Sequence, residues 1–291
     1  MRDFSQDHEW LSINTATLRR RQGTEQPLLD ILESCARHGV RAISPWRDQV
    51  AAAGLKATAQ AVRTHQFALS GYCRGGMFTA TSDAGLQLAR EDNRRALDEA
   101  CELNAACLVL VVGALPGALQ GQAAHKDLAL SRRQVVDGIG ELLQQARAQR
   151  MPLAIEPLHP MYTADRACVT TLEQALDICD ALDPARSGAL GVAVDMYHVW
   201  WDPKLKEQIA RAGRERLLAF HVCDWLTPTT DLLNDRGMMG DGVIDIRQVR
   251  GWMEAEGFSR FSEVEIFSHT WWQRSGDEIL DACIDRHKRF V

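Results

Sequence analysis

The stretch Gly191-Val-Ala-Val-Asp195-Met-Tyr-His198-Val-Trp-Trp-Asp202 shows most clearly how this chain is built. Its first half is an apolar, β-branched run, which is typical of a buried strand. Asp195 then stands where the strand meets its loop, and His198 follows three residues later. The stretch therefore predicts a strand that delivers a carboxylate, with an imidazole beside it, to one end of a sheet.

Three further segments have the same form. Leu153-Ala-Ile-Glu156 ends in a carboxylate, Leu217-Leu-Ala-Phe-His221 ends in an imidazole, and Val264-Glu265-Ile-Phe267 carries a carboxylate inside an apolar strand. Together with Asp195, they place four residues of metal-ligand type on four separate predicted strands. If these strands lie side by side and parallel, all four side chains point into one cup.

Strands and helices alternate along the whole chain. The predicted strands are 11–14, 40–44, 67–72, 107–112, 152–156, 190–195, 217–222 and 262–267. The predicted helices are 26–38, 48–65, 82–104, 129–149, 170–182, 203–213, 246–256 and 276–289. Such alternation implies a parallel sheet with right-handed crossovers, and eight units close into a (β/α)8 TIM barrel. Because no linker or low-complexity stretch interrupts the pattern, we expect a single α/β domain over residues 1–291.

The bulk composition narrows the class of protein. The length of 291 residues suits one barrel with modest extensions, and the net charge of −6 argues against a nucleic-acid or anionic-membrane partner. The N-terminus has no apolar stretch suited to a signal peptide, and no run is long enough to span a membrane. The eight cysteines form no C-x-x-C pair and are expected to be buried thiols. A cytoplasmic location is therefore the expectation.

Three carboxylates in one small cup would repel one another and raise each other's pKa. A divalent cation that binds Glu156, Asp195 and Glu265 together with His221 removes this conflict. Three oxygen ligands and one imidazole suit Mn²⁺, Mg²⁺, Co²⁺ or Zn²⁺, and the oxygen-rich set favours Mn²⁺ or Mg²⁺. Each residue alone is more often a cap, an ion-pair partner or a core histidine. The set of four in consecutive strand–helix units is what predicts a metal site.

Five short segments carry a family resemblance. They are Ile155-Glu156-Pro157, Val194-Asp195-Met-Tyr-His198, His221-Val-Cys-Asp224, Gly240-Asp-Gly242-Val-Ile-Asp245 and Val264-Glu265-Ile266. In order and spacing they resemble the xylose isomerase-like TIM-barrel superfamily, specifically its sugar phosphate isomerase/epimerase family. The resemblance covers roughly residues 9–290. It does not by itself fix the reaction.

The resemblance implies roles for individual residues. Glu156, Asp195, His221 and Glu265 would bind the metal, and Glu156 and Glu265 would also exchange protons with a substrate carbon from opposite faces. His198 would contact the substrate, and Arg236 matches the loop where family members place a substrate-binding arginine. The resemblance further implies carbohydrate metabolism, a small sugar or cyclitol as substrate, and a homo-oligomer.

The stretch after Glu156 departs from the epimerase pattern. His159 and Asp165 stand where epimerases have a further glutamate that holds the substrate. Related dehydratases of keto-inositols and lyases of oxidised sugars use the same metal cup to stabilise an enediolate. The expected activity is therefore isomerisation or epimerisation of a ketose through a metal-stabilised enediolate. Lyase or dehydratase chemistry, with His159 and His198 as acids, is the alternative.

Aromatic residues follow the predicted ligand strands closely. Trp225, like Trp200 and Trp201, could pack on the C–H surface of a sugar or could simply fill the barrel rim. No P-loop or G-x-G-x-x-G segment is present, so an unphosphorylated substrate is expected. A nuclease of the AP endonuclease type would need more strand-end histidines, and a non-catalytic subunit would not need the complete ligand set.

Overall fold

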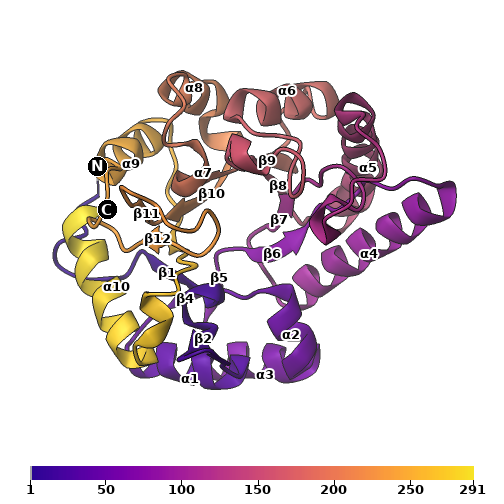
Figure 1. The fold of residues 1–291 in the computed structure, drawn as a ribbon. Coiled ribbons are helices and arrows are strands. Elements are labelled where there is room, and N and C mark those ends of the chain that lie inside the picture. The colour runs from indigo at the N-terminus through magenta and orange to yellow at the C-terminus, as the bar shows by residue number, and fades with distance from the viewer. Residues whose placement is uncertain (1) are drawn as a thin grey trace. The chain divides into compact units, whose positions relative to one another are not determined.

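The computed structural model describes residues 2–291, in which strands alternate with helices as predicted (Figure 1). The internal contacts define two compact units. Unit 1 combines the segments Met1–Tyr72 and Ala219–Val291, and unit 2 is the segment Cys73–Leu218. The assignment of residues 1–291 to one domain stays a prediction.

The strands of unit 1 come from the two ends of the chain. In order across the sheet they are β5 (Ala68–Leu69), β4 (Ala42–Ser44), β1 (Leu11–Asn14), β13 (Ser262–Val264) and β10 (Leu217–Val222). The pairs of β1 with β4, β1 with β13 and β13 with β10 are all parallel. In this register Ser12 and His221 both lie opposite Glu263. The pairing therefore brings Ser12, His221 and Glu263, which are distant in sequence, to adjacent positions across three strands.

Four further strands belong to unit 2. They are β6 (Tyr72–Gly75), β7 (Leu108–Val111), β8 (Leu153–Glu156) and β9 (Leu190–Asp195). The β7–β8 and β8–β9 pairs are parallel. Every residue of β7, β8 and β9 is buried, as expected for parallel strands that are covered on both faces. These strands consequently form continuous apolar runs in the sequence, and only β8 and β9 end in a carboxylate.

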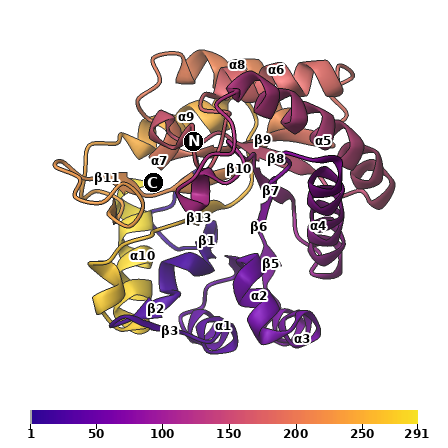
Figure 2. The same cartoon turned by 45° about the vertical axis from the view of Figure 1, so that its right-hand side comes forward.

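The helices pack on the strands within each unit (Figure 1). Those of unit 1 are α1 (Leu28–Arg37), α2 (Arg47–Ala53), α3 (Leu55–His65), α9 (Ile246–Ala255) and α10 (Gly276–Phe290). Those of unit 2 are α4 (Asp83–Glu102), α5 (Leu128–Gln149), α6 (Leu172–Leu182), α7 (Met196–Val199) and α8 (Leu205–Arg216). In unit 2, α4 packs against α5, and α6 packs against α8 (Figure 2). The side chains of Ser275 and Glu278 form a capping box that fixes the start of α10.

Four predicted boundaries were wrong. The helix expected over 48–65 is interrupted at Gly54, whose φ of 90° ends α2. The strand expected over 67–72 is split between β5 and β6. The strand expected over 262–267 stops at Val264. Beyond it, the Ile266 N–H donates to the side chain of Thr17, at 3.0 Å from Oγ1, and not to a backbone carbonyl of a neighbouring strand. Between the predicted strand 217–222 and the predicted helix 246–256, where no element was predicted, lies a short pair of strands, β11 (Asp224–Trp225) with β12 (Arg236–Gly237).

The cysteines and the helices bear on two predictions made from composition. Among residues 2–291 no cysteine forms a disulfide, and all the cysteines except Cys101 are buried. None of the helices in this range combines the length and apolar character that a membrane crossing requires.

Candidate metal centre

The four predicted ligands all stand where a strand ends. Glu156 and Asp195 are the last residues of β8 and β9, His221 is in β10, and Glu265 directly follows β13. All four are buried, with exposed fractions between 0% and 4%. As a group of buried acidic and histidine side chains, they could hold a metal ion. Their individual roles stay predictions.

In unit 2, Asp195 is fixed by the turn that follows it. Its Oδ1 accepts the Tyr197 N–H at 2.7 Å, so the carboxylate caps the short helix α7. Its other oxygen, Oδ2, lies 3.7 Å from Nε2 of His198. The three-residue spacing that was visible in the sequence therefore places the imidazole directly beside this carboxylate.

The proton position on His198 follows from its hydrogen bond. The His159 N–H donates to His198 Nδ1 at 3.2 Å, so Nδ1 is an acceptor. In the neutral ring the proton is then on Nε2, the nitrogen that faces Asp195. The ring of His198 is 3% exposed, and its backbone carbonyl accepts the Trp201 indole N–H at 2.8 Å. His198 is thus oriented by contacts on two sides.

His159 lies partly exposed at the edge of the same region. Its Nδ1 accepts the Met161 N–H at 3.3 Å, and its ring makes an edge contact with Trp201 at 5.7 Å between centroids. Burial lowers the pKa of His159, so the ring is neutral at neutral pH. A neutral imidazole can donate or accept a hydrogen bond. This is the property that a substrate contact at this position would need.

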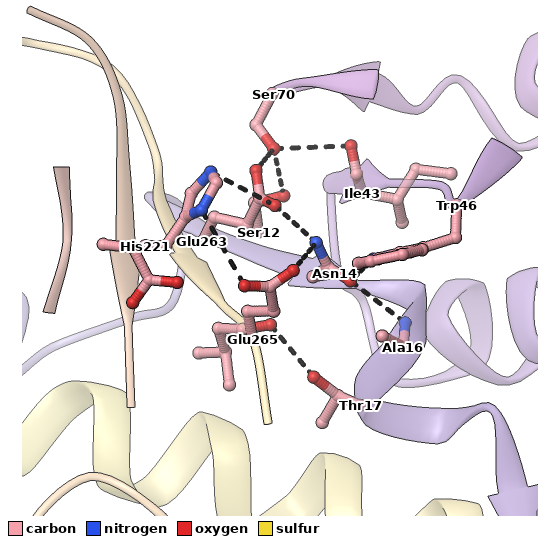
Figure 3. A network of polar contacts seen from close by, with 12 residues as sticks. Ser12, Asn14, Ala16, Thr17, Ile43, Trp46, Ser70, His221, Glu263 and Glu265 are labelled. Carbon is pink, nitrogen blue, oxygen red and sulfur yellow. Dashed lines mark hydrogen bonds and ion pairs between the residues drawn. The ribbon is translucent and has the colours of Figure 1, made fainter. Parts of the chain in front are cut away.

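In unit 1, Glu265 is held by two side chains. Asn14 Nδ2 donates to Glu265 Oε1 at 3.0 Å (Figure 3), and Arg236 Nη1 donates to Glu265 Oε2 at 3.0 Å. Arg236 is only 4% exposed, and its guanidinium also lies over the Phe267 ring at 5.3 Å from the centroid. The predicted substrate-binding arginine therefore contacts a predicted metal ligand. Trp225, across the β11–β12 pair from Arg236, is partly exposed.

His221 lies between two glutamates of unit 1. Its Nδ1 is 3.9 Å from Glu265 Oε2, and its Nε2 is 3.6 Å from Glu263 Oε1 (Figure 3). Both glutamates come from the segment of β13 and its end. Their side chains point to the same face because residues two apart in an extended strand do so. The imidazole is 0% exposed. Its two nitrogens therefore face two different carboxylates.

Glu263 also belongs to this region, although the sequence analysis does not predict it as a site residue. It is 1% exposed and accepts hydrogen bonds from Ser70 Oγ at 2.7 Å and from Asn14 Nδ2 at 2.8 Å (Figure 3). The sequence carries a signal for its place in the site, because Ser12 and Asn14 alternate with apolar residues in the same way as Glu263 and Glu265. A polar face with a period of two on an otherwise buried strand points into a polar interior.

The segments 221–224 and 240–245, noted above only for their resemblance, are bound to each other by Asp224. One of its oxygens accepts the Gly240 and Gly242 N–H groups, each at 2.9 Å, and the other accepts the Ile244 N–H at 3.0 Å. A Cβ at Gly242 would lie 2.1 Å from the Trp225 carbonyl oxygen. Only glycine therefore allows this loop to close onto Asp224.

The comparisons with known proteins bear on the family. A family model described as xylose isomerase-like TIM barrel matches residues 32–286. The solved protein SMc04130 from Sinorhizobium meliloti 1021 is 53% identical, with a TM-score of 0.91, over 97% of this chain and 98% of that one. No curated protein sequence matches significantly.

Two more distant structures share the fold. An IOLI protein with a bound zinc atom is 19% identical, with a TM-score of 0.77, over 94% of both chains. A D-psicose 3-epimerase, solved in the presence of D-fructose, is 13% identical, with a TM-score of 0.70, over 94% of this chain and 89% of that one. At these identities the likeness concerns the fold alone. Together with the family match, it confirms the predicted TIM barrel.

Proposed function

This chain belongs to the xylose isomerase-like TIM barrel family, and from that premise we propose that it is a divalent-metal-dependent isomerase or epimerase of a ketose or related keto-sugar. The observation that carries the proposal is the set of three buried carboxylates and one buried imidazole at strand ends, a group that could hold a metal ion. Buried carboxylates are costly unless they are paired or coordinate a cation.

We assign the metal to Glu156, Asp195, His221 and Glu265. The donor set fits Mn²⁺ or Mg²⁺ best, and the zinc bound to the IOLI protein makes Zn²⁺, with Co²⁺, a metal to test. When bound, such a cation supplies electrostatic stabilisation of the negative charge that develops on an enediolate. Among the nearby side chains, Arg236 already offsets charge on Glu265.

Glu156 and Glu265 carry the proton transfer in this proposal. One glutamate takes the proton from the carbon between a hydroxyl and a carbonyl group, and the electron pair of the C–H bond moves into the new enediolate. If the other glutamate returns a proton to the opposite face, the product is the epimer. If the proton goes to the neighbouring carbon, the product is the isomer. Asn14 and Arg236, which each donate to one oxygen of Glu265, would keep that carboxylate in place.

The substrate contacts come from the surrounding residues. His198, with its Nε2 proton on the side of Asp195, suits a contact to a sugar hydroxyl. His159, whose N–H donates to His198, and Trp225, which lies opposite Arg236 in the β11–β12 pair, are partly exposed. The D-psicose 3-epimerase fold relative was solved with D-fructose, which supports ketohexoses as the first substrates to test. A homo-oligomer and a cytoplasmic location belong to the same proposal. Sedimentation analysis and fractionation of the source cells test them.

Lyase or dehydratase chemistry is the second candidate. The observation that favours it is His159, which stands where the family resemblance places a second glutamate in epimerases; because burial lowers its pKa, its neutral ring could take up the proton removed from carbon and hand it on. A side chain that passes a proton to a leaving β-hydroxyl would convert the same first step into loss of water. Keto-inositols and oxidised sugars would then be the substrates.

Proton NMR in D₂O separates these reactions. The protein is stripped of metal, reloaded with Mn²⁺, and incubated with a panel of ketoses and keto-inositols. Exchange of the proton next to the carbonyl, with a new epimer or isomer appearing, is the expected result. An unsaturated product would move the protein to the lyases. No exchange with any substrate, together with no retained metal, would contradict both.

A further inference from the structure

Glu263 is buried in unit 1 but has no place in the proton transfer described above. It sits on β13, opposite Ser12 of β1 and opposite His221 of β10. Its Oε2 accepts the Ser70 hydroxyl at 2.7 Å, and its Oε1 accepts the Asn14 amide at 2.8 Å (Figure 3). The same Oε1 is the oxygen that lies 3.6 Å from His221 Nε2. Glu263 thus lies between the His221 imidazole on one side and the side chains of Ser70 and Asn14 on the other.

The network around Glu263 has a defined polarity. Asn14 Oδ1 accepts the Trp46 indole N–H at 2.8 Å and the Ala16 N–H at 3.0 Å, so its NH₂ group is the end that faces Glu263 and Glu265. A carboxylate can only accept, so the Ser70 hydroxyl donates to Glu263, and the Ser12 hydroxyl donates to Ser70 at 2.7 Å. Both oxygens of Glu263 are therefore held in place by donors, one from the end of β1 and one from the residue that follows β5.

From this arrangement we propose that Glu263 is a positioning residue that sets the tautomer and orientation of His221. The buried Glu263 oxygen favours the ring proton on Nε2, the nitrogen that faces it. The lone pair is then on Nδ1, the nitrogen on the side of Glu265. In metal sites, a carboxylate that accepts the second ring N–H of a metal-binding histidine commonly fixes its tautomer and raises the basicity of the nitrogen that binds the metal.

The assignment of His221 as a metal ligand rests on the proposed function, but the tautomer does not. The test therefore has two independent readouts. The first is the ¹H–¹⁵N long-range NMR spectrum of metal-free protein labelled with ¹⁵N-histidine, in which His221→Asn identifies the His221 signals. The second is the affinity for Mn²⁺ alone, measured by calorimetry. Thermal melting of the metal-free variants checks that they are folded.

Wild type is expected to show His221 as the Nε2–H tautomer. In Glu263→Gln, which keeps the shape but can turn an NH₂ group toward the ring, the tautomers should mix and the affinity for Mn²⁺ should fall about 10- to 100-fold. Ser70→Ala is the matched control, because it removes one donor and leaves the carboxylate beside the ring. It should keep the tautomer and change the affinity less than about threefold.

An Nδ1–H tautomer in the wild-type protein would overturn the proposal without any variant. So would a Glu263→Gln protein that keeps both the wild-type tautomer and the wild-type affinity. If wild type binds no Mn²⁺ while the tautomer shifts as expected in Glu263→Gln, the positioning role stands and the metal-dependent function fails.

Discussion

The proposed ligands of the two units are held in different ways. In unit 2, Asp195 is fixed by the N–H of Tyr197 and faces His198, contacts that span two and three residues of sequence. In unit 1, Glu265 is fixed by Asn14, 251 residues away, and by Arg236, 29 residues away. Local backbone geometry positions one carboxylate, and cross-strand side-chain packing positions the other. The unit 1 residues should therefore be the more sensitive to substitution of their neighbours.

The largest expected effect is on the glutamates themselves, one from each unit. Glu156→Gln and Glu265→Gln should each slow carbon-proton exchange by about 10²- to 10⁴-fold, because each removes a group that accepts or returns the proton. If they act on opposite faces, each variant should block exchange most strongly when the reaction starts from a different epimer. The measurement is deuterium incorporation by NMR from each epimer separately.

Glu33→Gln, a change at an exposed helix position, is the control and should exchange at the wild-type rate. Equal losses from both epimers in both glutamate variants would break the division of roles between the units.

The next effect concerns the buried ion pair of unit 1. Arg236→Met should lower the free energy of unfolding of the metal-free protein by about 3 kcal/mol, because it leaves the Glu265 carboxylate buried without its guanidinium partner. Lys204→Met in unit 2 removes an exposed, solvent-screened pair with Glu173 and should lower the free energy of unfolding far less. Urea denaturation measures both. Equal losses would show that the ion pair of unit 1 is no more important than a surface pair.

Unit 1 should also be the more acid-sensitive part. Burial lowers the pKa of His287 to about 3 from its ordinary 6.5, and the ring stacks on Phe4 at 4.8 Å between centroids. Arg250, Arg2 and His8 add positive charge around it, and Asp7 opposes them. Because the unfolded chain takes up the proton first, stability should fall below pH 6.5, by about 1.4 kcal/mol per pH unit, until the pH reaches the folded pKa.

His287→Phe keeps the stacked ring and removes the titrating group, so it should flatten this pH dependence in denaturation measured from pH 7 to pH 4.5. His159→Gln in unit 2 is the comparison and should leave most of the slope. The reverse pattern would place the acid sensitivity in unit 2.

The smallest effect is expected at His198 in unit 2. His198→Asn should raise KM about tenfold, the loss of roughly one hydrogen bond to substrate, while the affinity for Mn²⁺ changes little. Steady-state kinetics with the substrate found by NMR, beside calorimetry with Mn²⁺, separates the two. A large loss of metal affinity would mean that His198 supports Asp195 rather than the substrate.

The same contrast explains what the sequence could predict. The β-branched runs and their terminal carboxylates predicted the strands of unit 2, and the D-x-x-H spacing predicted the neighbouring positions of Asp195 and His198. The alternating polar residues of β1 and β13 are a local signal of a polar interior, but the contacts of Glu263 depend on the register of β1, β13 and β10. The pair of Arg236 with Glu265 depends on where the segment that carries β12 lies, which local sequence does not encode. The break at Gly54 and the early end of β13 likewise depend on a single φ angle and on one Thr17 hydrogen bond.

The central claim is the proposal that Glu156, Asp195, His221 and Glu265 bind one divalent ion. Calorimetric titration of metal-free protein with Mn²⁺ tests it directly, using wild type and the single variants Glu156→Ala, Asp195→Ala, His221→Ala and Glu265→Ala. The account predicts one Mn²⁺ per chain in wild type and a large loss of affinity in every variant, whichever unit carries it. Binding that survives both unit 1 variants or both unit 2 variants, or no binding by wild type, would contradict it.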